Sequence, residues 1–312
     1  MRKITDEPRL GDGLGKKRNK INREIYGLYF ILPFLVALLL FRFIPMVYTA
    51  VLSFTNWDGF ARELTFVGFD NYQRLLTDDP LFFRSLFNTF ILWFMHVFPR
   101  MAIALLCAVL FAQSRIRGRQ FFQAVFYFPN LVTASSIAVL ALLILNRQVG
   151  FLNQVLVAAN LVYEPINWLG VPNNARGVVA FLIWWMWFGH STILLTSGVL
   201  SIPRDVVESS MVDGANAWQR FWLITMPLLR PTFAFVFTTS LIGGLQNFDI
   251  PHVLDHLGDP NRSILTTVMH MFNMAFHARQ FGYGSAIAIA LFVVILVVST
   301  VLFKFINRRE EV

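Results

Sequence analysis

The chain has 312 residues, of which 56% are hydrophobic and only 14% are charged, and phenylalanine alone occupies 33 positions. This composition excludes an ordinary soluble domain or a disordered chain and indicates an integral membrane protein. The net charge of +8 does not indicate nucleic-acid binding, because the basic residues follow the loops between apolar runs and form no patch interleaved with aromatic residues. We therefore expect no nucleic-acid partner.

Six apolar runs are long enough to cross a membrane as helices, for which about 20 residues are needed. They cover residues 27–51, 86–112, 121–146, 177–200, 230–254 and 283–306. The first run is too long for the core of a secretory signal and is expected to remain as a helix. The sequence thus predicts an all-α integral membrane fold with six transmembrane helices. The predicted parts are a basic tail at 1–25, a transmembrane domain at 26–306 and a short tail at 307–312.

Lysine and arginine are concentrated in segments that fall on one predicted side of the membrane. These segments are 1–23, 113–120, 201–230 and the C-terminal tail. Positively charged loops are retained on the cytoplasmic side during insertion. Both termini and the 201–230 loop are therefore predicted to be cytoplasmic, in agreement with an even number of spans.

The 201–230 loop is predicted to hold two short helices that meet at a corner. Ser201 can cap the first helix, with Pro203 near its first turn. Gly214 can adopt the left-handed conformation that closes a helix, and Asp213 can accept N–H groups from the next one.

The second helix of this loop carries an apolar stripe formed by Trp218, Phe221, Trp222 and Thr225. Such a stripe either docks on a protein partner or lies flat in the lipid headgroup layer, and the spacing alone does not decide between them. Pro227 is expected to end or bend the helix where the fifth span begins.

The loop resembles the EAA loop of permease subunits in bacterial binding-protein-dependent ABC importers. The residues in register with that pattern are Glu208, Gly214, Ile224 and Pro227. Ser209 and Ser210 stand where the pattern has paired alanines, and Met226 stands for a leucine. These changes are small or conserve volume.

The resemblance extends over nearly the whole chain and is specific to carbohydrate-importer permeases of the maltose, lactose and glycerol-3-phosphate type. The segments that carry it are Asn88-Thr89, Phe128-Pro129, Ser201-Ile202-Pro203, Gln246–Asp249 and Phe281–Ala286. One departure is Gly258-Asp259-Pro260, where such permeases usually have Gly-Gly-Pro.

The resemblance implies a type I ABC importer permease fold in the bacterial cytoplasmic (inner) membrane, with the EAA coupling helices between spans four and five. The implied partners are a second homologous permease that completes a heterodimer, two cytoplasmic ATPases, an extracytoplasmic sugar-binding protein, the sugar and membrane lipid. ATP and Mg would bind the ATPases, so the chain itself is expected to be neither an enzyme nor a cofactor-binding protein. The residues assigned to ATPase coupling are Glu208, Asp213, Gly214, Ala215, Phe221, Ile224 and Pro227.

The glycine-rich, basic segment at 11–17 is not a phosphate-binding loop. Its glycines lack the required spacing, no Ser or Thr follows the lysine, and no strand precedes it. We expect a cytoplasmic tail there, near anionic lipid.

Sugars present C–H surfaces and hydroxyl groups together, so a sugar pathway is expected to combine aromatic rings with amides and carboxylates. The residues that meet this requirement are Trp187, Gly189, His190, Gln246, Asn247, Phe248 and Asp249. Interfacial anchoring is the alternative for the tryptophan. Arg100 follows Pro99 inside the second span, where it either faces a polar interior, in keeping with an anionic substrate, or holds a kink.

His252 and His256 lie four residues apart near two aspartates, but metal sites need fuller ligand sets, and no metal site is predicted. His270 and His277 are expected in loops. Two other functions stay open: a secondary transporter, for which Asp249 is the one candidate acid in a span, and a membrane-bound transferase, which would need clustered acids. The sequence also leaves glycerol-3-phosphate or a polyol as alternative substrates.

Overall fold

The computed structural model describes residues 29–60, 64–113 and 118–307. The tail predicted at 1–25, including the segment at 11–17, and residues 308–312 lie outside this part. The regular elements of the described residues are all helices, and an isolated bridge pairs Thr55 with Phe66. Five long apolar helices and one sharply bent pair are the candidate membrane spans among these residues.

The chain divides into two compact units, Met1–Leu52 and Ser53–Val312. In the first unit, a single apolar helix runs over Tyr29–Leu52. It contains a π-helical turn, η1 (Leu39–Phe43), which continues directly into α2 (Ile44–Leu52). This helix corresponds to the first predicted span, and its apolar side chains are exposed, as a span that faces lipid requires.

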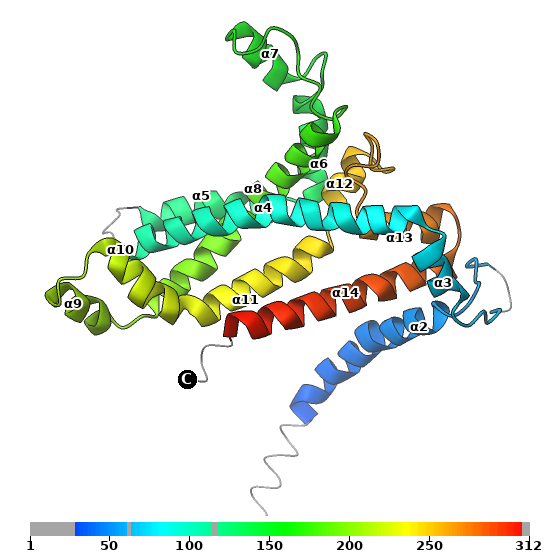
Figure 1. The fold of residues 1–312 in the computed structure, drawn as a ribbon, viewed down its shortest axis with the longest axis horizontal. Coiled ribbons are helices and arrows are strands. Elements are labelled where there is room, and N and C mark those ends of the chain that lie inside the picture. The colour runs from blue at the N-terminus through cyan, green and yellow to red at the C-terminus, as the bar shows by residue number, and fades with distance from the viewer. Residues whose placement is uncertain (1–28, 61–63, 114–117, 308–312) are drawn as a thin grey trace, which may run out of the picture. The chain divides into compact units, whose positions relative to one another are not determined.

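The second unit is built on four long helices. They are α4 (Pro80–Gln113), α8 (Pro172–Leu200), α11 (Met226–Leu245) and α14 (Phe281–Asn307). α4 packs along α8, and α11 contacts α4, α8 and α14 (Figure 1). Buried apolar side chains such as Ala104, Leu195 and Leu229 fill the space among α4, α8 and α11. Predicted spans two, four and six are confirmed as helices.

The third predicted span, at 121–146, is wrong as a single helix. It consists of α5 (Arg119–Leu131) and α6 (Ala134–Ile144), which are bent by 89° at a short break. The bend has a local cause, because Val132 and Thr133 are extended and the Thr133 hydroxyl accepts a hydrogen bond from a backbone N–H of the new helix. α5 lies along α8, whereas α6 contacts α12.

The sequence also missed a helix in the connection after α6, namely α7 (Phe151–Ala158). α6 and α7 project away from α4, α11 and α14 in Figure 1. Asn153 fixes this segment, because its amide is buried and bonds the backbone of Ile166 in both directions, as donor and as acceptor.

The fifth candidate span covers Ala217–Leu254, so it begins earlier than the predicted 230 and ends where predicted, with a short break after Leu245. α10 (Ala217–Arg220), the π turn η2 (Phe221–Thr225) and α11 follow one another without a break, and α11 ends at Leu245. We expected Pro227 to end or bend the helix, but the helix does not end there: it continues through Pro227 along α11. The π turn directly before this proline changes the hydrogen-bond register, so the helix passes a residue that has no N–H.

Of the remaining elements, three gather where α4 and α14 begin, and the fourth, α12, contacts α6 and α8 (Figure 1). The four are α3 (Asp70–Thr77), α12 (Asp249–Leu254), α13 (Thr267–Phe272) and the π turn η3 (Asn273–His277). The expectation that His270 and His277 lie in loops is wrong. His270 is a buried residue of α13, and His277 ends η3.

Candidate functional site

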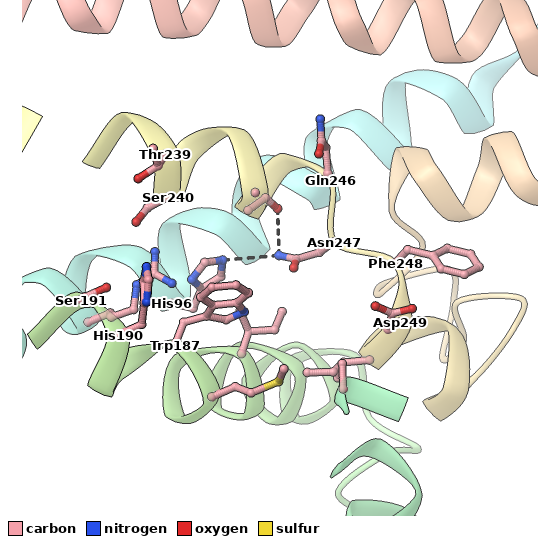
Figure 2. A pocket seen from close by; sticks show the side chains of 17 residues that line it. His96, Trp187, His190, Ser191, Thr239, Ser240, Gln246, Asn247, Phe248 and Asp249 are labelled. Atoms are coloured by element: carbon pink, nitrogen blue, oxygen red, sulfur yellow. Dashed lines mark hydrogen bonds between the residues drawn. The ribbon is translucent and has the colours of Figure 1, made fainter. Parts of the chain in front are cut away.

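A cavity of 320 Å³ lies among α4, α8, α11 and the turn that leads into α12 (Figure 2). Its lining includes every residue predicted for the substrate pathway except Gly189. These are Arg100, Trp187, His190, Gln246, Asn247, Phe248 and Asp249. The structure thus brings together side chains from three predicted spans.

The turn after α11 places the amide residues at the cavity. Asn247 Nδ2 donates a hydrogen bond of 2.8 Å to the Gly244 carbonyl, which satisfies a free acceptor at the helix end, and lies 3.5 Å from His96 Nε2. The backbone carbonyl of Asn247 accepts the Thr266 hydroxyl at 2.9 Å. The turn is therefore held from the α11, α4 and α13 sides.

α4 contributes two buried polar side chains one helical turn apart, His96 and Arg100, with relative exposures of 1% and 3%. Both line the cavity. Sequence reasoning identified Arg100 but missed His96, although the spacing of four residues within one span was a readable signal that they share a helix face. The hydroxyl residues missed in the same way are Ser191, Thr239 and Ser240.

α8 contributes Trp187 and His190, whose rings meet edge to face at 5.7 Å. The intervening Gly189 lies outside the lining and serves the contact with α5. A Cβ atom at this position would lie 2.0 Å from the backbone oxygen of Phe126. Glycine here allows α5 and α8 to approach closely.

The lining combines aromatic faces with hydrogen-bond donors and acceptors, and such a surface can hold a polyhydroxylated molecule. Within the described ranges, no group of three or more His, Cys, Asp or Glu side chains is arranged to hold a metal ion. His252 instead stacks on Phe248, with ring centroids 4.5 Å apart and an interplanar angle of 20°.

The predicted corner between two short helices exists in the 201–230 loop. The first helix is α9 (Arg204–Val212), and Gly214 follows it with a φ of 82°. The N–H groups of Gly214 and Ala215 bond back to the carbonyls of Met211 and Ser210, the two bonds of a Schellman motif.

Two predicted caps of this loop are wrong. Ser201 does not begin α9, because it ends α8 and donates its hydroxyl to the Gly198 carbonyl at 2.7 Å. Asp213 ends α9 and does not cap the next helix. That cap is Asn216, whose side chain and that of Gln219 bond each other's backbone N–H groups in a capping box.

The corner is exposed, and so are several of its apolar side chains. Trp218, Leu223 and Val212 are 70%, 73% and 88% exposed. Of the predicted stripe over 218–225, Trp218, Phe221 and Trp222 contact one another through their rings, whereas Thr225 is wrong as a member because it is buried at the end of the π turn. Among the residues assigned to coupling, those that are exposed are Glu208, Asp213, Gly214 and Pro227, and those that are half-buried are Ala215, Phe221 and Ile224.

Residues 83–312 match the family described as "Binding-protein-dependent transport system inner membrane component". The chain is 30% identical to the multiple sugar-binding transport system permease protein MsmF of Streptococcus mutans, over 93% of this chain and 98% of that one. It is 28% identical to the lactose transport system permease protein LacF of Rhizobium radiobacter, over 92% and 95% of the two chains.

The fold matches a chain in the crystal structure of a bacterial ABC transporter involved in the import of the acidic polysaccharide alginate, with a TM-score of 0.75. The match covers 95% of this chain and 100% of that one at 21% identity, and it establishes a common fold. The resemblance drawn from the 201–230 loop is confirmed by the family match, which extends over most of the length. The chain belongs to the family of inner-membrane components of binding-protein-dependent transport systems.

Proposed function

We propose that the chain is one of two related permease subunits of an ATP-driven bacterial importer that carries sugars, oligosaccharides in particular, across the cytoplasmic (inner) membrane. The observation that carries this proposal is the cavity among α4, α8 and α11, in which Trp187 lies beside amide, imidazole and hydroxyl groups. Aromatic faces suit the C–H surfaces of a sugar, and the polar groups suit its hydroxyls.

The names of related permeases support a sugar as the substrate class. They include permease proteins for arabinooligosaccharides in Bacillus subtilis and for diacetylchitobiose in Streptomyces coelicolor, each 29% identical to this chain. Because each subunit of a permease pair forms half of the pathway, we expect the partner permease to complete the cavity.

Coupling to ATP hydrolysis is assigned to the corner of α9, Gly214 and α10. Exposed apolar side chains at Trp218 and Leu223, together with the exposed carboxylate of Glu208, form a surface that suits a protein partner. α10 continues through η2 into α11, which lines the cavity. A movement of the corner by an ATPase can therefore reach the substrate through one continuous helix. ATP and Mg bind the ATPase subunits in this proposal.

The proposal is tested by purifying the tagged chain from its native membranes in mild detergent and identifying the proteins that accompany it. We expect a second permease and an ATPase. The purified complex, reconstituted in proteoliposomes, is expected to take up labelled oligosaccharides only with ATP and the binding protein. Recovery of the chain alone as a homo-oligomer would contradict the proposal and favour a secondary transporter.

The docking surface is tested separately by replacing Trp218 and Leu223 with serine. We expect much less ATPase in the purified complex, with the partner permease retained. Leu76→Ser is the matched control, because Leu76 is a similarly exposed apolar residue, at 61%, in α3. Equal loss of ATPase in both variants would contradict the assignment of the surface.

A further inference from the structure

We propose that the sugar carried through the cavity is anionic, and that its carboxylate binds the guanidinium of Arg100. This inference rests on the proposed function and names the substrate class of the same cavity. It follows from which polar side chains of the cavity lining have hydrogen-bond partners within the chain and which have none.

Arg100 lines the cavity, is 3% exposed, and has two nitrogens, Nε and Nη2, that are buried without a hydrogen-bond partner. Among the described residues the recorded ion pair is His270–Asp79, and Asp249, the acid of the same cavity, forms none with Arg100. A buried cation without a counter-charge or acceptors is costly. A ligand in the cavity can supply the acceptors that these two nitrogens lack.

Arg176 shows how this protein satisfies an arginine that serves the fold. It also lies in a long helix, α8, but its Nε donates to the Ser263 carbonyl at 3.1 Å and its Nη2 donates to Asn88 Oδ1 at 2.9 Å. The same two nitrogens are unpartnered in Arg100. The contrast assigns Arg100 to a ligand and not to packing.

His96, one turn before Arg100, adds a donor to the same side of the cavity. Asn247 Nδ2 lies 3.5 Å from His96 Nε2 (Figure 2), and when this ring nitrogen accepts from the amide, the imidazole proton lies on Nδ1. His96 Nδ1 is buried and has no partner in the chain. The α4 side of the cavity therefore presents donors that lack acceptors.

The acidic residue of the cavity lies apart from these donors. In Figure 2, Asp249 and Phe248 are on the far side of Asn247 from His190 and Ser191. A sugar can thus place its anionic group against α4 and its hydroxyls and ring faces toward α12. A carboxylate suits this site better than a phosphate, because one guanidinium offers a bidentate fork and one charge to a group with two oxygens and one charge.

The test uses the purified complex with its partner subunits and binding protein in proteoliposomes. The probes are disaccharides of galacturonate and of glucuronate, the matching neutral disaccharides of galactose and of glucose, and glucose 6-phosphate. We expect ATP-dependent uptake of a uronate disaccharide in preference to its neutral counterpart. Arg100→Gln is expected to lower uronate uptake about 10- to 100-fold, the effect of losing hydrogen bonds to a charged group, and thereby to lower the ratio of uronate to neutral uptake.

Arg100→Lys keeps the charge but loses the fork, so its uronate uptake is expected to lie between that of the wild type and that of Arg100→Gln. If Arg100→Gln does not assemble, the ratio of uronate to neutral uptake is measured with Arg100→Lys. Arg84→Gln is the matched control, because Arg84 is an exposed arginine of α4 away from the cavity. Uptake of neutral disaccharides alone, preference for glucose 6-phosphate, or equal loss of uronate and neutral uptake in the Arg100 variants would each overturn the anionic-sugar inference and leave the sugar importer standing. Absence of any sugar uptake by the wild-type complex would overturn both.

Discussion

Asp79 Oδ2 accepts a hydrogen bond from His270 Nε2 at 2.7 Å, across 191 residues of sequence. The Tyr283 hydroxyl donates to the same oxygen, and the other oxygen, Oδ1, accepts the N–H groups of Leu81 and Phe82 at the start of α4. One carboxylate therefore joins α4, α13 and α14. Its side chain is 12% exposed, so water competes little for these bonds.

Removing the Tyr283 hydroxyl should destabilise the second unit by about 2 kcal/mol, because a hydrogen bond to a charged acceptor is lost. We expect Tyr283→Phe to lower the unfolding temperature of the purified chain in detergent by several degrees. The control is Tyr72→Phe. The Tyr72 hydroxyl is hydrogen bonded to the neutral Ser53 hydroxyl at 2.7 Å, so this variant should lose about half as much unfolding free energy. Equal losses would show that the charge of Asp79 does not strengthen the bond.

The same carboxylate predicts a pH dependence. Burial alone would raise the pKa of Asp79, but the hydrogen bonds from Tyr283 and His270 outweigh it and lower the pKa below its ordinary value of 3.8. A lowered pKa contributes stability that is fully present above the unfolded-state value and is lost as the pH falls through the folded-state value. We expect the penalty of Tyr283→Phe to be constant between about pH 5 and 8 and to shrink below 3.8. A penalty that is unchanged at low pH would contradict this account.

The corner at Gly214 should tolerate residues that adopt a left-handed conformation and reject proline. Proline fixes φ near −65°, against the observed 82°, and removes the N–H that bonds the Met211 carbonyl. We expect Gly214→Pro to leave the spans assembled but to abolish transport. The control Gly214→Asn should retain most of it, because asparagine tolerates this conformation and no atom lies within 4 Å of the added Cβ. Normal uptake by the proline variant would contradict the assignment of the Gly214 corner to ATPase coupling.

Two glycines of α8 form a matched pair for the packing of α5. A Cβ at Gly189 would meet the Phe126 carbonyl oxygen at 2.0 Å, whereas nothing lies within 4 Å of a Cβ at Gly177. Gly189→Ala should therefore push α5 from α8 and cost about 1–3 kcal/mol, as overpacking does. Gly177→Ala should stabilise the helix by up to about 1 kcal/mol, the difference in helix propensity. Thermal unfolding of both variants in one detergent checks the pair, and equal shifts would contradict the role of Gly189.

Much of this fold could be predicted because lipid and helix geometry constrain the sequence strongly. Runs of apolar residues predicted the long helices. Gly214 predicted the left-handed corner, because glycine adopts that conformation without a steric penalty. The helix starts were less visible. α4 begins at Pro80 and not near residue 86, because Arg84 and Ser85 separate its first turn, which Asp79 caps, from the long apolar run.

The site was predicted in parts, since its residues come from separate helices. Trp187 and Asn247 each have the chemistry that a sugar requires, but only the packing of α8 against α11 brings them to one cavity. The bend before α6 was missed because its cap, Thr133, lies in an apolar run that reads as one span. A cap inside hydrophobic sequence is a weak signal unless the extended backbone around it is seen.

The unbroken course of the helix from α10 through η2 into α11 has a mechanical consequence. At 1.5 Å per residue it forms a rod on the order of 40 Å long. Pivoting such a rod by about 5° around its centre displaces each end by about 2 Å, enough to open or close a hydrogen bond. In the proposed coupling, a pivot about the middle of the helix, near the buried residues Leu229 and Ala234, would move Trp218 and the end near Asn247 by similar distances in opposite directions.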